Sequence, residues 1–174
     1  MADETRRGGC CVLVACVRCG QVRTRPTLVK VVSHLLHNVA RLGSVPYPQR
    51  YGFISDRLRS VRQELTVQGC RGDDVIRMYE CMTRFHVASV YRTAQTPHED
   101  VSPVLNEKSL TGCLTALLEM YAEKRAALAT AGPVSPCEAE MWSYAVLQHA
   151  ASEDLAYVPP PLAAALAQLH WVVL

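Results

Sequence analysis

The stretch "YGFISDRLRSVRQELTVQG" (residues 51–69) decides the fold class, because its apolar residues recur at the spacing of an α-helix. Arginines and acids lie off the apolar stripe, and Asp56 and Arg59 are spaced to pair with each other. Gly69 follows the last apolar turn, where a glycine ends many helices. The pattern predicts an amphipathic helix over about 48–68 with a strongly basic outer side. The residues of its apolar stripe are Ile54, Leu58, Val61 and Leu65.

Apolar residues at the same helical spacing predict five further helices, separated by short segments that contain proline and glycine. Ser135 and Glu138 have the spacing of a helix-capping box, with Pro136 between them. Six helices with short connections and no convincing strand pair predict an all-α fold of stacked antiparallel helix pairs, in the manner of an α-solenoid. The five further helices are expected at about 25–43, 73–95, 106–130, 135–151 and from 162 to 174. The apolar stripes of the first two run to Leu42 and to Val90.

Charge is distributed unevenly along the 174 residues, although the net charge is only +2. Residues 1–62 carry 11 Lys and Arg but three acids, whereas the remainder carries 7 basic and 13 acidic residues. A chain this polarised has one part suited to nucleic acid or to an acidic protein. The alternative is that the two parts attract each other, and the sequence leaves both readings open.

Eight cysteines are present, and four of them crowd into the first 19 residues. Cys16 and Cys19 form a single C-x-x-C motif, and the adjacent Cys10 and Cys11 are poorly placed to take two corners of a tetrahedral site. The other cysteines are scattered through predicted helices, like small buried hydrophobes. We therefore expect a reducing compartment, no metal and no cofactor. A metal or redox protein built on the four early cysteines is the distant alternative.

The sequence lacks the motifs of enzymes and of membrane proteins. It has no nucleophile-elbow serine, zinc-protease motif or phosphate-binding loop, and no apolar run approaches the ~18 residues that cross a bilayer. His86 lies on an apolar stripe and is expected to be a buried histidine with satisfied partners, whereas His34 and His37 are expected to face solvent. Glu80 and Arg84 are spaced for an intrahelical ion pair. We expect neither an enzyme nor a small-molecule substrate.

Four motifs follow one another in the order and spacing of a known domain. They read "FISDRLRSVRQELTVQG", "YECMTRFHVASVYR", "LNEKSLTGCLTALLEMYAEKR" and "SPCEAEMWSYAVLQHA". Together they resemble the SAC3/GANP domain over roughly residues 23–155. The matching residues are Phe53, Asp56, Arg57, Arg59, Arg62 and Glu64, then Arg84, Phe85 and His86, then Asn106, Leu110, Cys113 and Leu114, and finally Glu138, Ala139, Glu140 and Tyr144.

The resemblance implies a PCI-like fold, in which stacked helices lead into a winged helix. This chain would supply residues 23–174 as the N-terminal helical part, truncated before the winged helix and preceded by an atypical Cys-rich leader at 1–22. The implied function is a non-enzymatic scaffold in nuclear mRNA export and transcription-coupled complexes, with a PCI-domain subunit as partner. Short members of the family imply the alternative of a centrosome- or spindle-associated regulator of mitosis, found at those sites and in the cytoplasm.

The arginines of the signature helix have two expected roles. In stacked helices an arginine flanked by acids often ties neighbouring helices together through paired hydrogen bonds. We expect this structural role for Arg57 and Arg62. Arg50 and Arg59 are the candidates for contact with nucleic acid or with a protein partner.

Overall fold

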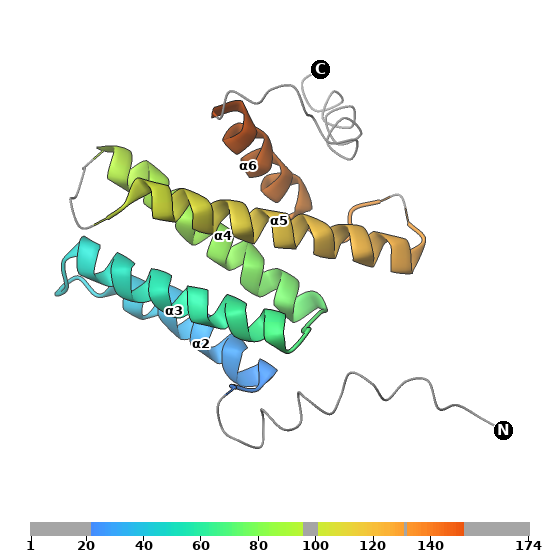
Figure 1. Ribbon diagram of the computed structural model, residues 1–174, viewed down its shortest axis with the longest axis horizontal. Helices are drawn as coiled ribbons and strands as arrows, with labels where there is room; N and C mark the ends of the chain where they lie inside the picture. The colour runs from blue at the N-terminus through green and yellow to red at the C-terminus, as the bar shows by residue number, and fades with distance from the viewer. Residues whose placement is uncertain (1–21, 96–100, 131, 152–174) are drawn as a thin grey trace. The chain divides into compact units, whose positions relative to one another are not determined.

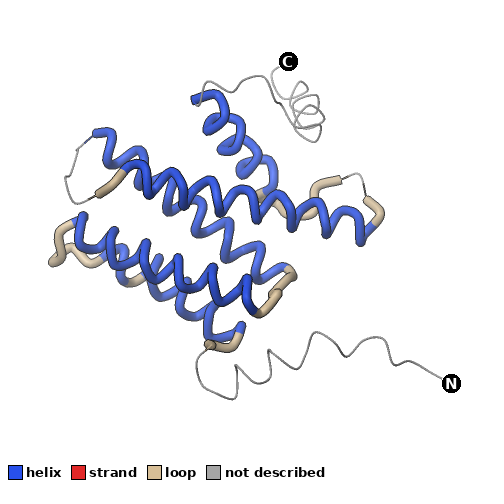
Figure 2. The backbone as a smooth tube through the Cα atoms, in the orientation of Figure 1, coloured by secondary structure: helices blue, strands red, loops and turns tan. Residues whose placement is uncertain are grey.

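A computed structural model describes residues 22–95, 101–130 and 132–151 of the chain (Figure 1). Helices and their connections account for all of these residues, and no strand occurs among them (Figure 2). The all-α prediction is therefore confirmed. The leader at 1–21 and the helix predicted from residue 162 lie outside the described residues. The elements are α2 (Arg25–His37), the 3-10 helix η1 (Val39–Arg41), α3 (Tyr47–Val67), α4 (Asp73–Gln95), α5 (Pro103–Leu128) and α6 (Glu138–Ala151).

The chain divides into two compact units, which are described separately. The described residues of the first unit are 22–78 and Val101, so it holds α2, η1, α3 and the start of α4. Those of the second unit are the rest of α4 together with α5 and α6. Antiparallel pairing of neighbouring helices is present within each unit, whereas the wider solenoid arrangement stays a prediction.

In the first unit α2 and α3 run antiparallel and are joined through η1 (Figure 1). The apolar stripe predicted for the 48–68 helix is the buried face of α3, where each of its four residues is at most 1% exposed. Leu28, Val32 and Leu35 of α2 are buried as well. Burial of apolar surface of this kind is the main source of stability for an amphipathic helix. The stripe residues are Ile54, Leu58, Val61 and Leu65.

Gly69 ends α3, as the sequence predicts. Its φ angle is +57°, in the left-handed region that favours glycine. The N–H of Gly69 donates to the carbonyl of Thr66 at 3.0 Å, and that of Cys70 donates to the carbonyl of Leu65 at 3.0 Å. These two bonds satisfy carbonyls that the helix end leaves without a partner, which is the pattern of a Schellman motif.

The first predicted helix is shorter than expected, because α2 ends at His37 rather than near residue 43. The N–H of Asn38 still bonds the carbonyl of His34, at 2.9 Å. The next bonds, from Arg41 and Leu42, reach back only three residues and form η1. This tightening changes the helical phase, since a 3-10 helix has three residues per turn. Leu42 is consequently 46% exposed.

In the second unit α4 and α5 are antiparallel, and α6 contacts α5 (Figure 1). Leu110, Leu114 and Ala145 form a buried cluster, and Tyr144 packs against it. Cys113 of the family motif is fully buried and is not in a disulfide.

Both predicted starts in this unit need correction. Helix α5 begins at Pro103 rather than near 106, because the side chain of Ser102 accepts the N–H of Leu105 and caps it. Helix α6 begins at Glu138 rather than at 135. The expected capping box is wrong. In such a box the Glu138 carboxylate would accept the N–H of Ser135, but it accepts the N–H of Val134 instead, at 2.8 Å. The hydroxyl of Ser135 accepts instead from the N–H two residues ahead, at 3.3 Å.

Candidate partner-binding groove

Glu64 ties α3 to the start of the described chain. Its carboxylate accepts the backbone N–H of Arg23 at 2.9 Å, and the Nε and Nη2 of the same arginine at 3.0 and 2.5 Å. Ser60 also donates to it, at 3.3 Å. Burial alone would raise the pKa of Glu64, but the bonds from Arg23 outweigh it and hold that pKa below its usual range. Sequence analysis found Glu64 but missed Arg23, which stands 41 residues away.

A second tie in the first unit joins Arg25 of α2 to Asp74 of α4. The Arg25 guanidinium makes two parallel bonds to this carboxylate and lowers the pKa of Asp74. Gly72 leaves room for it, because a Cβ there would lie 2.8 Å from Nη2 of Arg25. Gly72 also has a φ angle of +119°, in the region that favours glycine.

In the second unit, Arg84 and Glu80 both contact residues beyond their own helix. Arg84 Nε and Nη2 bond the carboxylate of Glu140 at 2.8 and 2.5 Å, and this guanidinium lowers the pKa of Glu140. The buried Glu80 accepts the hydroxyls of Tyr121 at 2.7 Å and Ser135 at 2.5 Å. The predicted Glu80–Arg84 ion pair is wrong, since each side chain has a stronger partner at longer sequence separation.

His86 and Asn106 form a buried pair between α4 and α5, 0% and 2% exposed respectively. Nδ2 of Asn106 donates to the carbonyl of His86 at 3.0 Å, so Oδ1 is left as the acceptor for His86 Nδ1 at 2.7 Å. The expectation that His86 is buried and that its Nδ1 is hydrogen-bonded is confirmed, whereas the expectation of full satisfaction is not, because its buried Nε2 makes no hydrogen bond within the described residues. Phe85 stands edge-on to the imidazole, with ring centroids 5.2 Å apart.

Glu138 and Tyr144 complete the polar contacts of the family motifs. The buried Glu138 accepts Nη2 of Arg125 from α5 and Nε1 of Trp142. The hydroxyl of Tyr144 donates to Glu140 at 2.9 Å. Most acids and amides of the motifs therefore hold one element against another.

The arginines of α3 differ from expectation. Arg57 pairs with its exposed neighbour Asp56 at 2.7 Å rather than with another helix, and the expected pairing of Asp56 with Arg59 is wrong. Arg50 donates to the carbonyl of Ala40 at 2.8 Å and is half-buried, so it supports η1, and its role as a contact residue stays a prediction. The carbonyl of Ala40 belongs to the short 3-10 helix, whose end leaves main-chain groups without an intrahelical partner.

Arg59 and Arg62 line a shallow hollow on α3 together with Gln63, Thr66 and Val67. Arg59 is exposed, and its role as a contact residue stays a prediction. Arg62 is half-buried, and its structural role stays a prediction as well.

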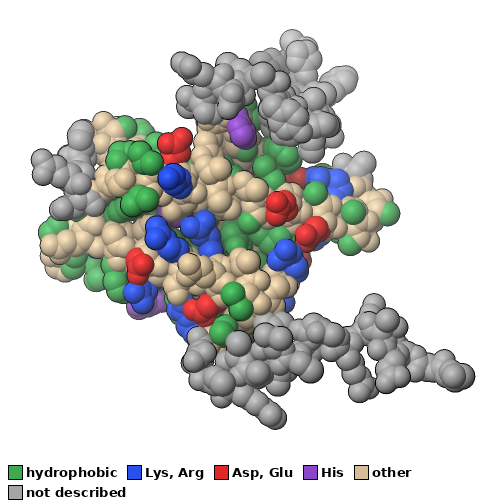
Figure 3. Space-filling model, in the orientation of Figure 1, with side chains coloured by type: hydrophobic (Ala, Val, Ile, Leu, Met, Phe, Trp, Pro, Cys, Tyr) green, Lys and Arg blue, Asp and Glu red, His purple; other side chains and the backbone are tan. Residues whose placement is uncertain are grey.

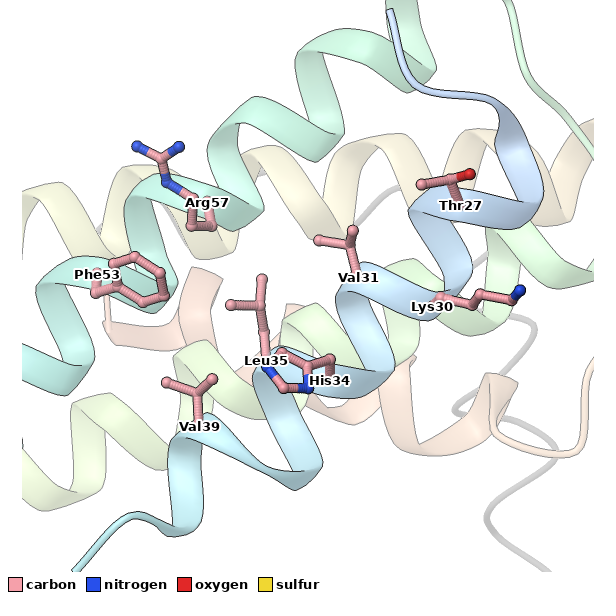
Figure 4. A pocket seen from close by; sticks show the side chains of 8 residues that line it. All are labelled: Thr27, Lys30, Val31, His34, Leu35, Val39, Phe53 and Arg57. Atoms are coloured by element: carbon pink, nitrogen blue, oxygen red, sulfur yellow. The ribbon is translucent and has the colours of Figure 1, made fainter. Parts of the chain in front are cut away.

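A groove of about 460 Å³ lies between α2 and α3 in the first unit (Figure 4). The aromatic motif residue Phe53 stands on its wall, 53% exposed, with the guanidinium of Arg57 5.8 Å from the ring centroid. Figure 4 shows Phe53 of α3 facing apolar side chains of α2 and η1, while the guanidinium of Arg57 points away from them. The lining residues are Thr27, Lys30, Val31, His34, Leu35, Val39, Phe53 and Arg57.

The surroundings of this groove are strongly basic. Residues 22–78 contain ten Lys and Arg but four acids, and three of those acids are in ion pairs with arginine. Figure 3 shows several Lys and Arg side chains over the face formed by α3. The groove itself is lined by Lys30, His34 and Arg57, and by no Asp or Glu. The unit therefore favours an anionic ligand.

A second groove, of about 640 Å³, lies in the second unit among α4, α5 and α6. Its lining includes Val90, Tyr91 and Leu147, which are 45, 67 and 66% exposed. Val90 was expected on the buried stripe of α4, but it lies in the last turns, where this groove is open. Sequence reasoning also missed that Phe53 and Tyr91 are exposed aromatic side chains.

Metal and membrane features can be assessed only over the described ranges. No group of His, Cys, Asp and Glu in them is arranged to hold a metal ion. His34 and His37 are exposed, as predicted. The predictions for the four early cysteines concern residues outside the described part of the chain, namely Cys10, Cys11, Cys16 and Cys19. None of the helices in the described part has the length and apolar character of a membrane span.

Lowering the pH should destabilise the protein through its ion pairs. Glu64, Asp74 and Glu140 have pKa values below their ordinary 4.5, 3.8 and 4.5. A carboxyl with a depressed folded-state pKa contributes stability above its unfolded value, and that contribution is lost as the pH falls through the folded value. The melting temperature should stay level from pH 7 to 5 and fall below about pH 4.5. A melting temperature that is constant down to pH 3 would contradict this, and Glu64→Gln should flatten the curve.

The described chain is an all-helical module in which polar motif residues hold helices together and leave grooves open on the surface. The chain belongs to the SAC3/GANP family, whose model matches residues 17–168. This membership supports a scaffold-like role.

Two curated relatives have the same modest identity. The chain is 28% identical over 134 residues to SAC3 family protein 1 of Schizosaccharomyces pombe, which covers 77% of this chain and 12% of the relative. It is 28% identical over 139 residues to Protein xmas of Drosophila melanogaster, covering 77% of this chain and 6% of that protein. The chain thus spans a small part of each relative. No solved structure matches it.

Proposed function

We propose that this chain is a non-enzymatic helical scaffold of the SAC3/GANP type, which acts in nuclear mRNA export and transcription-coupled complexes by binding a PCI-domain subunit. The single observation that carries the proposal is the family match over residues 17–168. The polar contacts support it, because Glu64, Arg84 and Asn106 are engaged in ties between elements rather than gathered around a cavity.

A scaffold benefits from such ties. A surface that is already fixed before binding loses less conformational freedom when a partner docks, so more of the contact energy remains as affinity. Interhelical bonds from Arg25 and Arg84, and the bonds from Arg23 to α3, fix the helices that carry the exposed grooves. We propose no catalytic residue and no cofactor.

Affinity purification of the tagged chain from nuclei tests this function. We expect a PCI-domain subunit and other proteins of an export complex to be recovered at near-stoichiometric amounts. A tagged chain with Asn106→Leu, which should be folded but less stable, is compared with it, and a lower recovery of the partner would show that binding depends on the folded module. Recovery of no PCI-domain subunit would contradict the proposal. Concentration of the tagged chain at spindle poles through mitosis would favour the centrosome alternative.

A further inference from the structure

We propose that the groove between α2 and α3 binds an acidic peptide segment of a protein partner, with one bulky apolar side chain of that segment inserted beside Phe53. This inference rests on the proposed scaffold function and specifies the chemistry of a partner.

The walls and floor of the groove favour an apolar anchor. Val31 and Val39 are half-buried, and Leu35 is only 4% exposed, so together they form an apolar floor. Phe53 faces them from α3 and leaves about half of its surface to solvent (Figure 4). Burying one large apolar side chain in the groove stabilises the complex. An aromatic anchor gains further from contact between its ring and that of Phe53.

The rim of the groove specifies the charge of the peptide. Lys30 and Arg57 lie at the groove, and His34 adds a third basic side chain. Arg57 is paired with Asp56, but both side chains are more than half exposed, so water screens that pair and the guanidinium can bind a second carboxylate. Because no acid lines the groove itself, Asp and Glu flanking the anchor would meet Lys30, His34 and Arg57 there. Asp56 is the acid at the rim, and it is already paired.

A peptide fits this groove better than single-stranded RNA does. Sequence-tolerant RNA binding uses a basic track along the backbone together with aromatic side chains on which successive bases stack. Phe53 is the one aromatic side chain among the lining residues, and most of the others are aliphatic or short. An apolar channel between two helices with charge at its rim is instead the geometry that binds amphipathic peptides.

Selection from a display library of random 12-residue peptides on the full chain provides the probe. We expect the selected peptides to combine a Leu, Phe or Trp with flanking Asp or Glu. The affinity of a selected peptide, measured by fluorescence anisotropy, should fall at least tenfold with Phe53→Ala and with Lys30→Glu. Rising salt should weaken the binding, because the charged contacts are exposed.

Matched controls lie on α3 outside the groove. Val67→Ala removes an exposed apolar side chain and Gln63→Glu adds a negative charge at an exposed position, and both should leave the affinity within twofold. Circular dichroism of each variant confirms that it is folded. Lys30 is exposed, so Lys30→Glu keeps the test valid even if Phe53→Ala lowers the stability.

Three results would overturn the proposal. The first is selection of peptides without acidic enrichment, and the second is an affinity that is insensitive to Phe53→Ala. The third is displacement of the peptide by oligouridine RNA, together with an equal loss of RNA binding in Lys30→Glu and Arg59→Glu. That result would assign a nucleic-acid surface instead. Recovery of the PCI-domain subunit from nuclei separates the two proposals, because it tests the scaffold function without depending on this groove.

Discussion

Replacing Asn106 by leucine should lower the stability of the protein by about 2–3 kcal/mol, since it removes both hydrogen bonds of a buried pair. Asn106 accepts from His86 Nδ1 at 2.7 Å and donates to the carbonyl of the same residue at 3.0 Å. Leucine has a similar size but neither a donor nor an acceptor, so His86 would lose this acceptor in a site that water does not reach. The cost therefore comes from lost polar partners and not from a cavity.

Thermal and urea unfolding, followed by circular dichroism, measure this effect. We expect the melting temperature to fall by roughly 10 °C, on the scale typical of a domain of this size. Lys108→Leu is the matched control, because it places the same side chain on an exposed position of α5. It should change the stability by less than about 0.5 kcal/mol. Equal melting temperatures for the two variants would show that the His86–Asn106 pair contributes little.

The apolar periodicity of the sequence predicted which faces of the helices are buried. Ile54 and Leu65, at the two ends of the α3 stripe, are both 1% exposed, because a continuous α-helix keeps its phase over that length. The prediction failed at Leu42, where the helix changes to a 3-10 turn, and at Val90, which lines an open groove among α4, α5 and α6. Periodicity describes a helix in isolation, and it contains no information about where a covering helix ends.

Partners of charged residues were predicted less well, because spacing rules consider only one helix. Arg84 has Glu80 four residues away, yet it bonds Glu140, which is 56 residues away. An exposed intrahelical pair contributes about 0.3–0.5 kcal/mol. Two parallel charge-assisted bonds between helices contribute more, so the tertiary partner prevails. Glu80 then takes the hydroxyl of Tyr121, at 2.7 Å, in a buried site.

The family motifs select residues without indicating their roles. His86, Asn106 and Glu138 are all buried and hydrogen-bonded between elements, as residues in a structural motif would be. Phe53 is different, since an aromatic side chain that is 53% exposed contributes little to the core of its own helix pair. Its place in a motif and in a groove, rather than its burial, makes it a candidate for binding. No local spacing rule separates these two cases.

Comparing the stability of Glu64→Ala with that of Arg57→Ala tests which charged residue of α3 holds the fold together and which is available to bind a partner. Glu64 accepts the backbone N–H, Nε and Nη2 of Arg23, and its side chain is only 17% exposed. Removing this carboxylate leaves a half-buried guanidinium and a main-chain N–H without their acceptor, which should cost about 2 kcal/mol. Arg57 is 52% exposed and pairs with a neighbour on its own helix, so Arg57→Ala should cost less than about 0.5 kcal/mol.

Urea unfolding of both variants and of the control Gln63→Ala, an exposed neighbour on α3, decides the matter. We expect the midpoint to move clearly for Glu64→Ala and to stay near the wild-type value for the other two. A double-mutant cycle of Glu64→Ala with Arg23→Met should recover part of the loss, because neither partner is then left alone. If Arg57→Ala proves as destabilising as Glu64→Ala, then Arg57 is a structural tie and cannot be free to bind an acidic partner. If Glu64→Ala is the more destabilising of the two, Glu64 is the charged residue of α3 that has a structural role. Arg57 then remains available at the groove to bind a carboxylate of a partner.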